Sequence, residues 1–277
     1  MQYKKGLLMG LGLFSCIEAA MEKYLLFPFL FGAFLGISWC ANIPNDLNDG
    51  LTEKRFWFNK PIKPKPTSTK FDVVFLLDSS NSVGRYSFKT AKRFASNLLN
   101  YFSIFPAKTR VAVASYNGNV TLHFDFNKYA NKDCVERQIK NLKFQDGSTD
   151  IGKALEYVRT DLIHNINNGA RNKAKKVIFL FTAGRNGENA LDPIKPALKL
   201  KQKGVKIFVL YLIGQSRFRN AGYRNRFRHR LGKWRTFYLL RKIVSGSSYL
   251  LSARSYAAFY RVMALLRLGK RIVLWFY

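Results

Sequence analysis

Short apolar runs alternate with amphipathic segments along most of this chain, beginning at Phe71. The apolar runs are rich in β-branched and aromatic residues, which is typical of strands buried on both faces of a parallel sheet. They predict strands at 72–77, 110–116, 120–126, 176–182, 205–212 and 249–252. The other segments have helical spacing, at 86–102, 132–143, 150–166, 190–202, 236–244 and 254–267. This alternation predicts an α/β fold, with a Rossmann-like, doubly wound and mainly parallel six-stranded sheet and helices on both faces.

One pair of strands departs from the parallel series. Asn117-Gly118 separates the second and third apolar runs, and this dipeptide is a strong signal for a tight hairpin. We therefore expect one antiparallel edge strand. Asn119-Val120-Thr121 begins at the same turn and forms an acceptor sequence for N-glycosylation at Asn119, which would be used only if the chain is secreted.

The first strand ends in the candidate site. Asp78, Ser80 and Ser82 follow the apolar run at alternate positions. Open α/β sheets bind their ligands at the carboxyl ends of the strands. A carboxylate and two hydroxyls are hard oxygen donors, which suit Mg²⁺ or Mn²⁺. The alternative is that a serine simply caps the next helix.

The amino-terminal region predicts a leader and a linker. Residues 1–41 contain two apolar stretches, the second of which is 24–40, and they fit a secretory signal peptide with cleavage after Cys40. An uncleaved signal anchor is the alternative, and Met21 offers a second translation start. Residues 42–70 contain turn residues and a Pro/Lys-rich run, which indicates an extended linker. We expect a secreted protein, or a membrane-anchored one with its domain outside.

The net positive charge of the chain limits the kinds of partner that it would attract. The 277 residues contain 47 Lys+Arg against 16 Asp+Glu, which gives a formal net charge of +31. Asp192 is the last acidic residue, so the carboxyl-terminal third carries most of the positive field. A charge of this size indicates anionic partners, such as acidic polysaccharide, anionic lipid, nucleic acid or an acidic protein.

The basic residues gather between the fifth strand and the next helix, interleaved with aromatic residues. Guanidinium groups bind sulfate, phosphate and carboxylate through two hydrogen bonds. Sulfated glycosaminoglycan, acidic lipid and single-stranded nucleic acid all fit, and a solvated loop without a partner is the alternative. The candidate anion-binding residues are Arg217, Arg219, Arg224, Arg226, Arg228, Arg230, Lys233 and Arg235. A basic and then apolar tail follows at 269–277.

The sequence gives little support for enzymatic catalysis or for a disulfide framework. Three histidines lack metal-ligand spacing, and no Ser/His/Asp or Cys/His set can be assembled, so we expect no enzymatic activity. Two of the three cysteines lie in the leader, so no disulfide framework can be deduced. We expect the third, Cys134, to be a buried small apolar residue.

From about Phe71 to Leu268 the chain resembles a von Willebrand factor type A domain, similar to those of matrilins and type VI collagen. The resemblance rests on the order and spacing of several motifs. These are 72–84, the strand 110–116 with its hairpin, 126–129, 139–142, 147–155 and 176–184. It implies a metal-ion-dependent adhesion site with Asp78, Ser80 and Ser82 as its Asp-x-Ser-x-Ser element and Thr149 as its threonine. Such a metal keeps a position open for a carboxylate of a protein ligand.

The chain departs from the family pattern after the fourth strand. The family usually has Thr-Asp-Gly there, whereas this chain has Thr182-Ala183-Gly184. One of two carboxylates is therefore missing, which weakens the attraction for a divalent cation. The alternative is a serine-rich loop held by caps and local hydrogen bonds without a metal.

Three hypotheses for function follow. The first is a secreted adhesion module that binds extracellular matrix protein, collagen-like or other, and acidic polymers. The second is a membrane-anchored scaffold or receptor, which requires an uncleaved leader. The third, ranked last because it leaves residues 1–41 unexplained, is an intracellular nucleic-acid-binding protein.

Overall fold

The computed structural model describes residues 69–184, 186–187, 189–212, 235–253 and 257–266. It contains a six-stranded sheet in the order β3-β2-β1-β4-β5-β6. The strands are β1 (Phe71–Asp78), β2 (Thr109–Tyr116), β3 (Val120–Phe124), β4 (Lys175–Thr182), β5 (Lys206–Tyr211) and β6 (Leu250–Ser252). All pairs are parallel except β2 with β3, which form the hairpin expected at Asn117-Gly118. The predicted fold class is confirmed.

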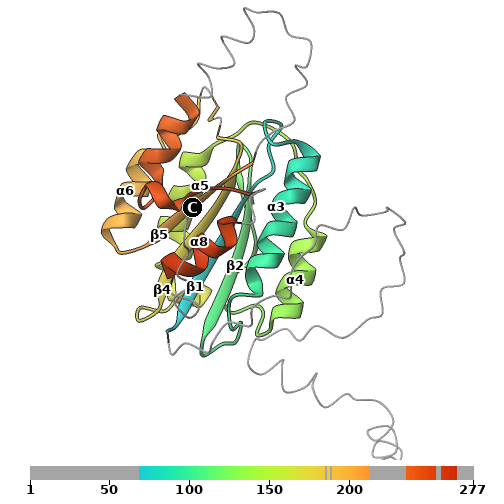
Figure 1. Cartoon of the computed structure of the whole chain (residues 1–277), viewed down its shortest axis with the longest axis vertical. Helices are drawn as coiled ribbons and strands as arrows, with labels where there is room; N and C mark the ends of the chain where they lie inside the picture. The colour runs from blue at the N-terminus through green and yellow to red at the C-terminus, as the bar shows by residue number, and fades with distance from the viewer. Residues whose placement is uncertain (1–68, 185, 188, 213–234, 254–256, 267–277) are drawn as a thin grey trace, which may run out of the picture. The chain divides into compact units, whose positions relative to one another are not determined.

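Helices cover both faces of the sheet (Figure 1). They are α3 (Gly84–Leu99), α4 (Lys132–Asn141), α5 (Ile151–Tyr157), α6 (Ile194–Gln202), a helix over 235–243, and α8 (Ala257–Leu266). Buried side chains of α3, α4 and α8 share one hydrophobic cluster, whereas those of α5, α6 and the helix over 235–243 share the other. The sheet is therefore the middle of three layers.

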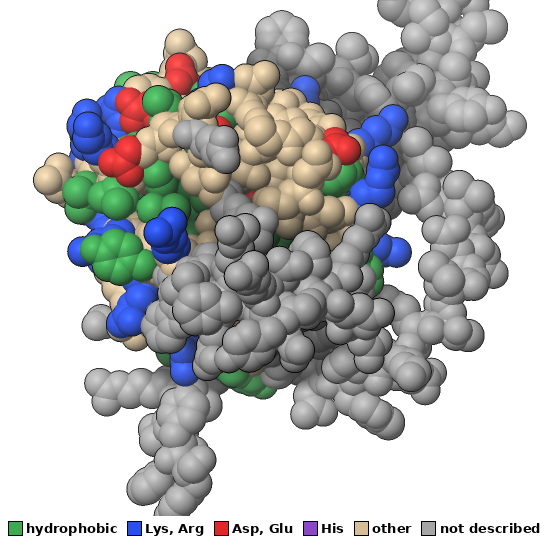
Figure 2. Space-filling model, turned by 90° about the horizontal axis from the view of Figure 1, so that it is seen from above, with side chains coloured by type: hydrophobic (Ala, Val, Ile, Leu, Met, Phe, Trp, Pro, Cys, Tyr) green, Lys and Arg blue, Asp and Glu red, His purple; other side chains and the backbone are tan. Residues whose placement is uncertain are grey.

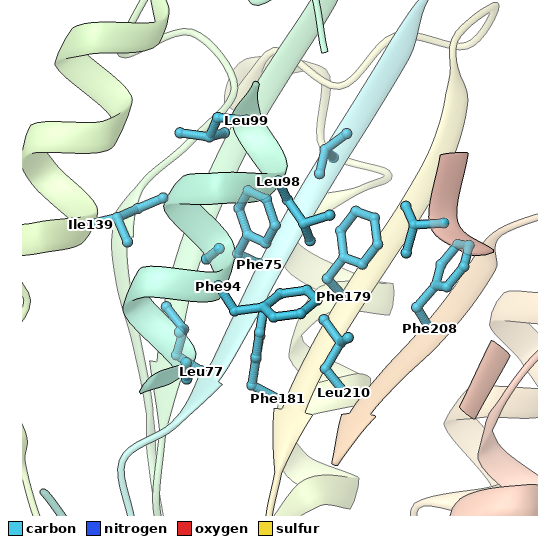
Figure 3. Close-up of a cluster of buried hydrophobic side chains, with 14 of the residues drawn as sticks. Phe75, Leu77, Phe94, Leu98, Leu99, Ile139, Phe179, Phe181, Phe208 and Leu210 are labelled. Carbon is cyan, nitrogen blue, oxygen red and sulfur yellow. The ribbon is translucent and has the colours of Figure 1, made fainter. Parts of the chain in front are cut away.

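The alternation of side chains along a strand builds both clusters. On β1, Val73, Phe75 and Leu77 enter the first cluster, while Val74 and Leu76 enter the second. The first cluster is rich in phenylalanine, and Figure 3 shows rings from β1, β4, β5 and α3 meeting over the sheet. Because β1 is buried on both faces, its sequence is a continuous apolar run.

Two element boundaries differ from the sequence prediction by four residues or more. The helix predicted over 150–166 is α-helical only to Tyr157 and continues as a π-helical turn, Val158–Leu162. The helix predicted from residue 190 begins at Ile194. The loop before it is held instead by Asp150, whose Oδ2 accepts a hydrogen bond from the Leu191 N–H at 3.2 Å.

A buried ion pair lies near the amino-terminal end of β1. Asp72 is 1% exposed, and its carboxylate accepts hydrogen bonds from the Arg171 guanidinium at 2.7 and 2.9 Å. Arg171 also donates to the carbonyl oxygens of Phe71, Pro106 and Lys108. One side chain therefore ties β1 to the loops before β2 and β4.

Cys134 is buried on α4, as expected. Among the helices that the structure describes, none has the length and apolar character to cross a membrane. The boundaries at 1–41, 42–70, 71–268 and 269–277 stay predictions, and the first, second and last segments lie outside or almost outside the described residues.

Candidate metal-binding site

Asp78 is the last residue of β1 and is fully buried. Its Oδ1 accepts a hydrogen bond from the Ser80 N–H at 3.0 Å, and its Oδ2 accepts one from the Thr182 hydroxyl at 2.9 Å. The register of the sheet explains the second contact, because Leu77 lies opposite Phe181 on β4. Asp78 follows Leu77 and Thr182 follows Phe181, so the two are neighbours at the edge of the sheet where the parallel strands end.

The two predicted serines and the predicted threonine converge beside this carboxylate. The Ser80 and Ser82 hydroxyl oxygens are 2.8 Å apart, and the Ser82 and Thr149 hydroxyl oxygens are 3.1 Å apart. Ser80 and Thr149 are buried, whereas Ser82 is half-buried. A tight turn places the serines here, since Gly84 has a φ of 71°, which glycine adopts without strain. The structure thus brings together all four residues that the resemblance implies.

The spacing of these oxygens fits a small hard cation. Mg²⁺ binds six oxygens at about 2.0–2.1 Å in an octahedron, so adjacent ligand oxygens lie about 2.9 Å apart. The two hydroxyl–hydroxyl distances, 2.8 and 3.1 Å, bracket that value, and in this structure they are hydrogen bonds between the hydroxyls. The donors are all oxygen, as magnesium and manganese prefer. With one carboxylate the four side chains carry a single negative charge when Asp78 is ionised.

Burial sets the protonation of that carboxylate. Loss of water raises the pKa of Asp78 from 3.8 to about 6. Hydrogen bonds from Ser80, Thr182 and the Ala183 backbone act in the opposite direction but do not cancel it. The phenol of Tyr116 is also buried, and burial together with the charge of Asp78 raises its pKa well above 10.

The missing carboxylate is not supplied by another described residue. Ala183 is half-buried and its side chain packs against the first hydrophobic cluster. Asp150 follows Thr149 but caps α5, because its Oδ1 accepts from the Lys153 N–H at 2.7 Å while its Oδ2 binds the Leu191 N–H. Within the residues that the structure describes, no group of three His, Cys, Asp or Glu side chains could hold a metal.

Thr182 is the site residue that sequence reasoning left without a role. It donates its hydroxyl hydrogen to Asp78 and accepts the Gly184 N–H at 2.9 Å, so it joins the two loops. The signal that could have found it is its position, directly before Ala183 at the end of a predicted strand. Its role is to orient Asp78.

The other predicted sites have different outcomes. Asn119 is exposed at the hairpin turn, and its side-chain oxygen accepts a hydrogen bond from Lys153 Nζ at 2.7 Å, so glycosylation there stays a prediction. The predicted anion-binding residues Arg217 to Lys233 lie outside the described residues. Arg235 is the exception, and it is exposed at the start of the helix over 235–243.

Comparison with known proteins identifies the family. The model of the von Willebrand factor type A domain matches residues 72–226, which include β1 except its first residue, β2 to β5, and all four candidate site residues. The chain belongs to the von Willebrand factor type A domain family. The resemblance seen in its motifs is thereby confirmed.

Relatives of this domain occur in larger proteins. Human von Willebrand factor A domain-containing protein 2 is 32% identical over 143 residues, which are 52% of this chain and 18% of that protein. Matrilin-1 of Gallus gallus is 28% identical over 144 residues, 52% of this chain and 28% of that protein. The chain spans less than a third of the length of these curated relatives.

A solved structure supports the fold. Proximal thread matrix protein 1 from the mussel byssus, solved with a zinc-occupied MIDAS motif, has a TM-score of 0.56 to this chain at 22% sequence identity. The match covers 72% of this chain and 47% of that protein. The likeness supports the fold, and the zinc-occupied motif is a property of that protein.

Proposed function

We propose that this chain is a non-enzymatic, secreted adhesion module that binds an acidic residue of an extracellular matrix protein at the Asp78 edge of the sheet. The observation that carries the proposal is the convergence of the Ser80, Ser82 and Thr149 hydroxyls. They come from two loops that are 67 residues apart, yet their oxygens lie at ligand spacing. Collagen and matrix proteins among the relatives support this class of partner.

The proposed metal is Mg²⁺ or Mn²⁺, held by Ser80, Ser82 and Thr149 with Asp78 behind the serines. A bound cation would supply a Lewis-acidic contact for the carboxylate of the ligand. Asp78 balances the positive charge from its buried position, and Thr182 holds it in place by a 2.9 Å hydrogen bond. Because Ala183 brings no second carboxylate, we expect the affinity for metal to be weak.

Calorimetric titration of the full chain with Mg²⁺ and Mn²⁺ tests the proposal, alongside Ala183→Asp. A carboxylate added about 5 Å from a divalent ion contributes roughly 2 kcal/mol even at the dielectric constant of water, which is more than tenfold in Kd. We expect the variant to bind at least tenfold more tightly than the native chain. Ala107→Asp is the control, because it adds the same charge at an exposed loop position before β2 and leaves the affinity unchanged.

Loss of binding in Ser82→Ala and Thr149→Ala would place the metal at this site. If the native chain and Ala183→Asp both fail to bind Mg²⁺ and Mn²⁺, the proposed metal site is wrong. Binding that survives both hydroxyl deletions would place the ion elsewhere.

A second candidate function is binding of an acidic polymer, such as a glycosaminoglycan, through Arg217 to Arg235. It is supported by the net charge of +31 and by the absence of acidic residues in the sequence after Asp192. Replacing the arginines of 217–230 by glutamine should weaken binding of a sulfated polysaccharide. A membrane-anchored receptor is the alternative form of the module, and the amino terminus of the mature protein, read by mass spectrometry, separates the two.

A further inference from the structure

The helix over 235–243 places large aromatic side chains in water. Phe237 is 40% exposed and Tyr238 is 64% exposed, while Leu240 and Ile243 on the same helix are buried in the second hydrophobic cluster. The helix is therefore anchored by one face and presents the aromatic residues on the other. Exposed apolar patches that are rimmed by polar residues mark interaction sites, whereas scattered single apolar side chains do not.

Basic residues share this exposed face. Arg235, Arg241 and Lys242 are all exposed, and the helix has no acidic residue. The described residues contain no carboxylate paired with any of the three. The Lys242 ammonium lies 5.3 Å from the centroid of the Tyr238 ring, and the Phe237 ring lies 5.3 Å from the ring of Tyr211. Cations and rings are thus interleaved on one rigid element.

The helix begins at the same edge of the sheet as the candidate metal site. A side chain at Gly184, which follows Ala183, would meet Thr236 Cγ2 at 2.2 Å, so the two segments are in close contact. In Figure 1 this helix is the orange-red one at the upper left, beside the carboxyl ends of the strands.

The neighbouring helix extends the basic surface. Lys201 on α6 donates to the Lys242 carbonyl oxygen at 2.7 Å, which fixes the two helices side by side. Lys195, Leu198 and Lys199 of α6 are also exposed. Seen from above, basic and hydrophobic side chains are intermixed at the left of the domain, with acidic side chains beside them (Figure 2).

We propose that the exposed face of the helix over 235–243 binds an acidic, sulfated polysaccharide. Flat rings such as Tyr238 and Phe237 offer apolar faces on which the C–H faces of sugar rings stack. Guanidinium and ammonium groups pair with sulfate and carboxylate. Arg235, Tyr238 and Lys242 lie at spacings of three and four residues, so they form a row about 10 Å long on one side of the helix.

The combination of rings and cations favours this partner over an acidic peptide, which would use the charges but not the rings. The inference deepens the second candidate function, since both assume an acidic polysaccharide. It differs by locating recognition on a helix packed against the core. A polymer lying along this helix would reach the edge of the sheet that carries Asp78.

The test measures binding of heparin, as the sulfated polysaccharide probe, to the full chain in the presence of EDTA. Tyr238→Ala should weaken binding roughly fivefold, and Tyr238→Phe should retain it, because the ring and not the hydroxyl makes the contact. Replacing Arg235, Arg241 and Lys242 together by glutamine should weaken binding by about tenfold or more and lower its dependence on salt. All these side chains are exposed, and thermal melts verify that each variant is folded.

The matched control replaces Lys89, Lys128 and Lys143 by glutamine, which removes the same charge from exposed positions elsewhere. If this control weakens binding as much as the helix variant, only net charge matters and the proposal is wrong. Equal binding of polyglutamate, or tighter binding of oligothymidylate, would also overturn it. The helix variants are repeated with the arginines of 217–230 replaced, so that failure of the helix proposal and failure of the basic segment are distinguishable. EDTA keeps the outcome independent of the proposed metal site.

Discussion

Replacing Asp78 by asparagine should change how the stability of the protein depends on pH. Burial raises the folded-state pKa of Asp78 from 3.8 to about 6. The charged form is therefore disfavoured in the folded protein relative to the unfolded chain. Ionising Asp78 therefore costs about 3 kcal/mol more in the folded protein than in the unfolded chain, since each pKa unit corresponds to about 1.4 kcal/mol.

The sign of this pH dependence follows because the folded protein binds the proton of Asp78 more tightly than the unfolded chain does. The contribution of Asp78 to stability is fully present below pH 3.8, and it is lost as the pH rises through about 6. Between pH 7.5 and pH 5.0, protonation of this one group should stabilise the metal-free protein by about 1 kcal/mol. Asp78→Asn cannot take up that proton. Its own hydrogen bonds to Ser80 and Thr182 change the stability by an amount that does not vary with pH.

Urea unfolding of the full chain, followed by circular dichroism in EDTA at pH 7.5 and 5.0, measures this difference. The free energy of unfolding of the native protein minus that of Asp78→Asn should rise by about 1 kcal/mol at the lower pH. A difference that stays constant, or that falls, would refute the argument that burial controls this carboxylate. Adding Mn²⁺ at pH 7.5 at 100 times its Kd should stabilise the native chain by about 2.7 kcal/mol and Asp78→Asn by much less.

Two further predictions concern parts of the molecule away from this site. Arg171→Met should destabilise the fold by about 3–5 kcal/mol, because it leaves the buried carboxylate of Asp72 without its partner; urea unfolding measures this, and a loss below 1 kcal/mol would show that water replaces the guanidinium. Expression in secretory cells should yield a glycan at the exposed Asn119, detected as a mass difference that disappears in Thr121→Ala; an unmodified chain would contradict both the acceptor and the secretion proposals.

The sequence by itself determined the elements and their order. The apolar run of β1 predicts a strand buried on both faces, and Asn117-Gly118 predicts the one antiparallel pair, because both signals depend on neighbouring residues. The placement of Asp78, Ser80 and Ser82 at the end of that strand followed from the same local pattern. The observation that Ala183 stands where the family has a carboxylate came from the resemblance to the family.

The tertiary structure decided which side chains meet. The Thr149 hydroxyl lies 3.1 Å from that of Ser82, and Thr182 binds Asp78, only because β1 lies between β2 and β4 with a fixed register. Asp150 is a helix cap and not a ligand because the loop at Leu191 packs over α5. The burial that raises the pKa of Asp78 and the exposure of Tyr238 both depend on contacts among segments far apart in the chain. No local pattern encodes such contacts, since they arise from the packing of the whole sheet and its two helical layers.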